Sequence, residues 1–178
     1  MSEKSSQNEK QARKDVAIES KLPLNAIDIE SQKDMESGRY HPLRGLHKWF
    51  AARPTPAARL AIIASSYPGE IDSDELLKLM QIAPGRKSGI ADYVESKFAE
   101  KRSSGSVDDH YGYPNPNKQS PTAAQLESFH QKLRNMWGGE LPTILDPTAG
   151  RGIIPFEAMR YGLPVKANEL NPVPTLIM

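Results

Sequence analysis

The sequence has no cysteine, and this absence excludes disulfides, thiolate metal sites and cysteine nucleophiles. It also fits a reducing compartment. Long apolar runs are absent too: the longest, residues 60–64, is far too short to cross a bilayer, and the N-terminus lacks the apolar core of a signal peptide. The four histidines show no metal-ligand spacing. These absences predict a soluble, cytoplasmic protein with neither a membrane partner nor a bound metal.

Excess charge of either sign is also lacking, since 23 Lys and Arg residues stand against 22 Asp and Glu residues. The overall charge therefore gives no argument for nucleic acid, membrane or an acidic substrate. Residues 37–69 differ, because they contain no acid and mix basic residues with aromatic ones. The relevant side chains are Arg39, Tyr40, Arg44, Lys48, Trp49, Phe50, Arg53 and Arg59. They suit DNA phosphates and a stacked base, or else a small aromatic core beneath a solvated basic face.

Composition divides the chain into four parts. The first is mostly Ser, Gln, Lys and Glu and is expected to be a disordered tail, because it cannot bury enough apolar surface to order itself. The second is the basic and aromatic segment, and the third is helical with a flexible loop near residues 103–118. The fourth begins a βαβ unit. Their expected bounds are residues 1–20, 21–69, 70–140 and 141–178.

Apolar residues at helical spacing predict the helices of the middle of the chain. The first starts at Thr55, as a cap followed by Pro56, and two more cover residues 73–80 and 90–101. The clearest pattern follows Ser120, which is expected to cap a helix with Pro121 at its first position and Gly138 at its end.

A strand–loop–helix–strand pattern comes next. Residues 143–145 and 165–168 are short apolar strands, and residues 154–161 form a helix that stops at Gly162. This is the first βαβ unit of a parallel sheet. The predicted fold class is therefore α/β, the beginning of a Rossmann-like sheet after a mainly helical region.

The loop between the first strand and this helix reads Asp-Pro-Thr-Ala-Gly-Arg-Gly over residues 146–152. Gly150 and Gly152 remove Cβ atoms where the chain must turn sharply and where a ligand would approach the backbone. Glu169 lies 23 positions after Asp146, at the end of the second strand. That spacing suits an acid that accepts hydrogen bonds from ribose hydroxyls, so the pair of features predicts an adenosine-type ligand.

Two alternatives compete with this interpretation. A dinucleotide fingerprint requires a third glycine where this chain has Pro155, and it does not call for an acid before the glycines. Asp146 would repel a pyrophosphate, whereas it suits the positively charged methionine end of S-adenosyl-L-methionine (AdoMet), directly or through the loop. The residues thus favour AdoMet over NAD. The second alternative is turn chemistry without a ligand.

Longer blocks carry a family resemblance. Residues 144–152 and 168–172 resemble the AdoMet motif and the acidic second motif of amino-methylating DNA methyltransferases. Residues 22–27, 47–54 and 169–173 are similar to the DUF1156 family, which is described as adenine-specific DNA methylases found in genome-defence settings. The resemblance covers most of the chain after residue 21 in discontinuous blocks. It implies an AdoMet-dependent DNA methyltransferase that acts on the N6 amino group of adenine.

The resemblance also implies roles for individual residues. The cofactor-binding set would be Asp146, Pro147, Thr148, Gly150, Gly152, Glu169 and Asn171, with Glu169 on the ribose and Asn171 near the adenine edge. The segment at residues 49–54 would close the methionine end of the pocket. Its lid or DNA-contact residues would be Lys48, Trp49, Phe50 and Arg53. The family usually reads Trp-Trp-Ala-Arg-Arg-Pro there, so Phe50 and Ala52 are departures.

The Asp/Asn/Ser-Pro-Pro-Tyr/Phe loop of such enzymes is missing, because the sequence contains no Pro-Pro dipeptide. That loop holds the target amino group while its aromatic ring stacks on the flipped base. No catalytic residue is therefore assigned, and the chain alone is expected to be inactive. A second polypeptide or a missing C-terminal part would complete the fold. The alternatives are a non-catalytic fragment that binds nucleic acid or a partner, and an NAD- or nucleotide-binding Rossmann module.

Overall fold

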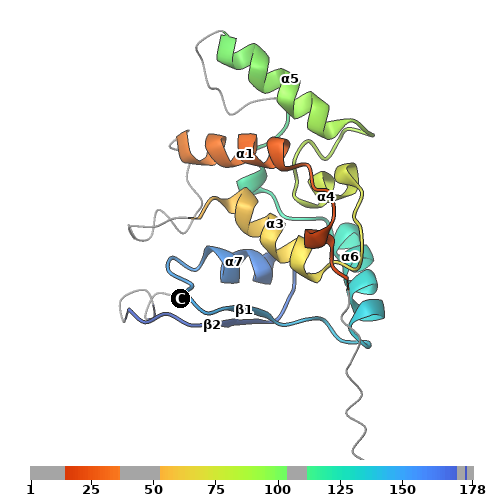
Figure 1. The fold of residues 1–178 in the computed structure, drawn as a ribbon, viewed down its shortest axis with the longest axis vertical. Helices are drawn as coiled ribbons and strands as arrows, with labels where there is room; N and C mark the ends of the chain where they lie inside the picture. Colours follow the sequence, from red (N-terminus) through yellow and green to blue (C-terminus); the bar gives the residue numbers. More distant parts are fainter. Residues whose placement is uncertain (1–14, 37–52, 104–111, 172–174, 176–178) are drawn as a thin grey trace, which may run out of the picture.

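A computed structural model describes residues 15–36, 53–103, 112–171 and 175 (Figure 1). The protein is mainly helical, with a two-stranded parallel sheet towards the end of the chain. Its elements in chain order are η1 Ala17–Glu19, α1 Leu24–Glu36, α3 Thr55–Ser66, α4 Ser73–Leu79, α5 Ile90–Ser103, η2 Pro116–Lys118, α6 Ala123–Met136, β1 Ile144–Asp146, α7 Ile153–Arg160 and β2 Val165–Ala167. Within the described ranges no helix is both long and apolar enough to span a bilayer.

Helix α3 lies in the middle of the molecule, between α1 on one side and α7 on the other (Figure 1). Ile62 and Ile63 of α3 are 1% and 0% exposed. They belong to one continuous core with Leu77 of α4, Leu133 of α6 and Tyr161 after α7. The helical region and the βαβ unit therefore share a core.

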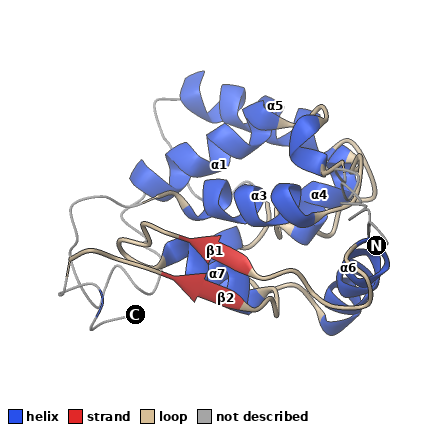
Figure 2. Cartoon of the chain, turned by 60° about the horizontal axis from the view of Figure 1, so that its bottom comes forward, coloured by secondary structure: helices blue, strands red, loops and turns tan. Residues whose placement is uncertain are grey.

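The βαβ unit forms where the sequence predicts it. β1 pairs with β2 in parallel, with Ile144 opposite Val165, and α7 lies over one face of the pair (Figure 2). Ile144 and Val165 pack against the core on that face. Leu145, whose side chain alternates to the other face, is 67% exposed.

Helix α1 was not predicted from the sequence. Its buried face mixes Ala26 and Ile27 with Glu30 and Lys33, whose exposed fractions are only 3% and 4%. Glu30 accepts hydrogen bonds from Lys33 Nζ at 2.7 Å and from the Tyr113 hydroxyl. Charged residues on the inner face remove the apolar periodicity that identifies a helix in sequence.

The predicted helix starts need correction at two caps. Pro54, not Thr55, is the N-cap of α3, and the Thr55 N–H donates instead to Asp34 Oδ2 of α1 at 3.0 Å. The N-cap of α6 is Thr122, not Ser120, because Thr122 and Gln125 form a reciprocal capping box. In α3 the contact with Asp34 of another helix replaces a local side-chain cap. In α6 the capping box begins two residues after the predicted cap.

The tail assignment also changes at its end. Residues 15–20 pack against α3 instead of belonging to a disordered segment. Ala17 is fully buried and its N–H donates to Tyr67 O at 3.0 Å, while Val16 forms an antiparallel bridge with Pro68. Residues 1–14 lie outside the described part of the chain.

Candidate functional site

Asp146, the last residue of β1, lies beneath the glycine loop. Its side chain is 3% exposed, and Oδ1 accepts the Thr148 N–H at 3.1 Å. This bond from a carboxylate to the amide two residues on is an Asx turn, which shapes the start of the loop. Because the carboxylate is buried, Asp146 shapes the loop instead of being open to solvent.

The two loop glycines have the backbone conformation that the sequence implies. Gly150 has φ 53° and Gly152 has φ 78°, both in the left-handed region that side chains with a Cβ rarely adopt. Gly152 is also the N-cap of α7, and its N–H donates to Ala149 O at 2.8 Å. The chain thereby reverses from β1 into α7 within a few residues.

Glu169 reaches this loop from the end of β2. Its Oε2 accepts the Gly150 N–H at 2.6 Å, and its Oε1 accepts the Asn171 N–H at 3.2 Å. These backbone hydrogen bonds lower the pKa of Glu169 below its ordinary value. The bond from Asn171 has the largest effect, followed by the bond from Gly150. The carboxylate is therefore ionised at neutral pH.

The backbone at the end of β2 completes the contact. The Asn168 N–H donates to Asp146 O at 2.9 Å, and the Asn168 carbonyl accepts the Ala149 N–H, also at 2.9 Å. The Asn168 side-chain amide donates to Pro147 O at 3.4 Å, and Pro147 itself is exposed. The structure thus joins the two motifs that the sequence separates by 23 positions.

Leu170 was missed in the sequence analysis. It lies between Glu169 and Asn171 and is 92% exposed, so it presents an apolar side chain next to the site. An exposed leucine by itself is ordinary on a protein surface. Its position directly after a strand-end acid was the available signal.

Arg53 is the one expected lid residue that falls within the described residues. Its Nη1 and Nη2 donate to Thr148 O and Thr148 Oγ1, each at 3.3 Å, and Nη1 lies 3.5 Å from Asp146 Oδ2. The Arg53 side chain is 47% exposed. Lys48, Trp49 and Phe50 lie outside the described residues.

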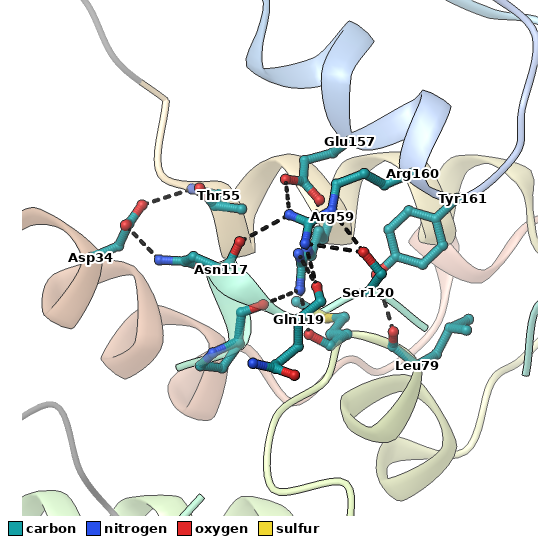
Figure 3. A network of polar contacts seen from close by, with 12 residues as sticks. Asp34, Thr55, Arg59, Leu79, Asn117, Gln119, Ser120, Glu157, Arg160 and Tyr161 are labelled. Atoms are coloured by element: carbon teal, nitrogen blue, oxygen red, sulfur yellow. Dashed lines mark hydrogen bonds and ion pairs between the residues drawn. The ribbon is translucent and has the colours of Figure 1, made fainter. Parts of the chain in front are cut away.

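A buried polar network holds α7, which follows the loop, against α3 (Figure 3). Arg59 of α3 is 1% exposed and donates to Glu157 Oε2 of α7 at 2.7 Å. It also donates to the carbonyls of Met80, Pro116 and Gln119 at 2.8 to 2.9 Å. The N–H groups of a buried guanidinium need such acceptors, and here they come from three segments: α7, the end of α4 and the η2 turn.

Arg160 and Tyr161 extend the same network (Figure 3). Arg160 donates to Glu157 Oε1, Asn117 O and Gln119 O at 2.6 to 2.9 Å. Burial raises the pKa of Tyr161, whose neutral hydroxyl donates to Leu79 O at 3.0 Å. Since Arg53 lies just before α3 and the glycine loop just before α7, the network sets the distance between them.

A cavity of about 500 Å³ lies away from this site, between α4 and the start of α6. Its carboxylates already have structural partners. Asp72 accepts the N–H groups of Asp74 and Glu75, and Asp74 accepts those of Gly89 and Ile90. In the residues that the structure describes, no group of three or more His, Cys, Asp or Glu residues is arranged to hold a metal ion.

The strand–loop–helix–strand geometry defines a βαβ unit with an acid-bearing glycine loop. Residues 21–78 match the model of the DUF1156 family, which is described as a protein of unknown function. The chain thus contains a DUF1156 domain over these residues. The matched range includes Arg53 and Arg59 but ends before the glycine loop and Glu169. No curated protein and no solved structure matches the chain.

Proposed function

We propose that this chain is the cofactor-binding part of an AdoMet-dependent DNA methyltransferase whose target is the N6 amino group of adenine. The observation that carries the proposal is the 2.6 Å hydrogen bond from Gly150 N to Glu169 Oε2, next to the buried carboxylate of Asp146. Two acids from separate motifs therefore meet one glycine loop.

This arrangement supports AdoMet over a dinucleotide. A pyrophosphate needs free loop amides, yet the N–H groups of Thr148 and Gly150 already donate to carboxylates. The ionised carboxylate of Glu169 beside the loop would also repel a phosphate, whereas AdoMet carries a positive sulfonium and a positive ammonium group. The charge of the site thus suits a cationic adenosine ligand.

The residues present fit the ligand at its adenosine end. A carboxylate has about four lone-pair positions, so Glu169 can accept ribose hydroxyls in addition to its two backbone donors. Leu170, 92% exposed, offers an apolar surface to the adenine ring, and Asn171 lies next to it. Bound AdoMet would supply the activated methyl group. The sequence has no Pro-Pro-Tyr/Phe loop, so these residues have binding roles and none is assigned to methyl transfer.

Calorimetric titration of the purified chain with AdoMet and with NAD tests this proposal. We expect AdoMet to bind and Glu169→Ala to weaken it about tenfold or more, because hydrogen bonds to a charged group are lost. Asp146→Ala should weaken it too, through the altered loop. Glu95→Ala, at an exposed position of α5, is the matched control and should change nothing.

Either of two results would contradict the proposal. In the first, Glu169→Ala binds AdoMet as tightly as the wild type. In the second, NAD binds more tightly than AdoMet, which would assign the site to a dinucleotide.

A further inference from the structure

Arg53 is positioned against the ligand site by contacts on one side of its guanidinium. Nη1 and Nη2 reach the backbone and side-chain oxygens of Thr148, and Nη1 faces Asp146 Oδ2 at 3.5 Å. All three acceptors belong to the glycine loop. The chain leaves Arg53 directly for α3, which the Arg59–Glu157 ion pair fixes against α7.

The charge of Asp146 favours the position of the Arg53 guanidinium against the glycine loop. Its side chain is 3% exposed, and among the described residues Oδ2 has no hydrogen bond, so its only compensating charge is that of Arg53. A buried carboxylate without a counter-charge is costly, which favours an arginine held above it. Asp146 and Thr148 are therefore positioning residues for Arg53.

The rest of the guanidinium remains accessible. The Arg53 side chain is 47% exposed, and in the part of the chain that the structure describes Nε donates to no acceptor. Arginine binds carboxylates through two parallel N–H···O bonds, a geometry that one free edge of the guanidinium permits. Arg53 thus has a held edge towards the loop and a donor edge directed away from it.

We infer that Arg53 recognises the carboxylate at the amino-acid end of AdoMet and so selects for ligands that carry it. This inference rests on the proposed function. Arg53 compensates the charge of Asp146 and keeps an exposed positive edge, which attracts a ligand carboxylate. Glu169 lies at the other side of the glycine loop, where it accepts the Gly150 N–H. Two other roles for Arg53, contact with a DNA phosphate and blocking of the empty loop, are outcomes of the test.

The test compares two ligands that share adenosine and a thioether sulfur. S-adenosylhomocysteine carries the amino-acid end, and 5′-methylthioadenosine does not. Calorimetry on the full chain would measure the affinity for each ligand in the wild type and in the variants Arg53→Gln and Arg53→Lys. The control is Arg86→Gln, because within the described residues the Arg86 guanidinium lies over the Tyr93 ring and contacts no residue of the glycine loop. Melting curves of each variant show whether the fold is retained.

We expect Arg53→Gln to weaken the binding of S-adenosylhomocysteine about tenfold or more, because a charge-assisted pair is lost, and to leave the affinity for 5′-methylthioadenosine unchanged. The affinity of Arg53→Lys for S-adenosylhomocysteine should lie between those of the wild type and Arg53→Gln, since a lysine keeps the charge but not the paired donors. Arg86→Gln should alter neither ligand.

Three results would overturn the inference. An equal loss for both ligands means that Arg53 only holds the loop, unchanged affinities mean that it does not touch the ligand, and tighter binding of S-adenosylhomocysteine means that it blocks the site. If the wild type binds neither ligand, the proposed function fails and this inference falls with it. If 5′-methylthioadenosine binds while Arg53→Gln has no selective effect, the inference alone fails.

Discussion

At the scale of single residues, Asp146 and Glu169 are carboxylates whose surroundings give them different contacts. Asp146 is buried under the loop that it shapes, and its charge faces Arg53. Glu169 is half-buried and receives two backbone N–H groups, which leaves part of its oxygen surface for a ligand. From the sequence, Asp146 could act directly or through the loop; in the structure its buried carboxylate bonds the loop, while Glu169 keeps exposed oxygen surface.

The lowered pKa of Glu169 predicts how the loop responds to acid. A carboxyl whose pKa is lower in the folded state stabilises the fold above its ordinary pKa, and that contribution is lost as the pH falls through the lowered value. We therefore expect the Gly150–Glu169 contact to persist at neutral and mildly acidic pH. It should be lost only below 4.5, the ordinary value.

The Gly150 amide resonance in an NMR titration would report this transition. Glu169→Gln is the control, because an amide cannot titrate and should show no such step. A step in the wild type at a pH above 4.5 would contradict the lowered pKa.

At the scale of elements, the pairing of α3 with α7 depends on the Arg59–Glu157 ion pair, whose side chains are 1% and 0% exposed. Removing one member of a buried pair leaves the other charge uncompensated. The resulting loss of folding free energy exceeds the net stabilisation that the intact pair provides. Glu157 also holds Arg160, so its carboxylate serves two guanidinium groups. The consequence reaches the site, since α7 carries the glycine loop.

We predict that Glu157→Gln lowers the free energy of unfolding by about 3–5 kcal/mol, measured by urea denaturation. The double variant Glu157→Gln/Arg59→Met should lose less than the sum of its single variants, because the residues are in contact. Glu127→Gln, at an exposed position of α6, is the control and should remain near wild type. Additive losses in the double variant would show that the pair is not coupled.

At the scale of the whole molecule, the DUF1156 domain depends on residues beyond its matched range. Arg59 lies within residues 21–78, yet it donates to Met80, Pro116, Gln119 and Glu157, all of which follow that range. Its core is also shared with α6 and α7. The family segment and the βαβ unit therefore form one folding unit in this chain.

A fragment of residues 15–78 is accordingly expected to lack a cooperative melting transition. The full chain, measured in parallel by circular dichroism, should show one, because only there does the buried guanidinium find its acceptors. A fragment that retained its helices and melted cooperatively would show that the matched segment folds independently.

The βαβ unit was predictable because its signals are local. Two short apolar strands, glycines with obligatory left-handed backbone and an acid at fixed spacing all lie within residues 144–169. Helix α1 was not predictable in this way, since its inner face carries Glu30 and Lys33, which pair with each other and with Tyr113 from a distant segment. The acceptor for the Thr55 N–H at the start of α3 likewise comes from Asp34, 21 positions away.

By itself, the sequence determined where β1, the glycine loop, α7 and β2 lie, because backbone conformation and apolar spacing are properties of neighbouring residues. Only the tertiary structure decided that Arg53 rests on Thr148, 95 positions later, and that Arg59 is buried against Glu157, 98 positions later. Those contacts depend on packing α3 against α7. The charge of the candidate site, and with it the ligand end that Arg53 would bind, follows from that packing.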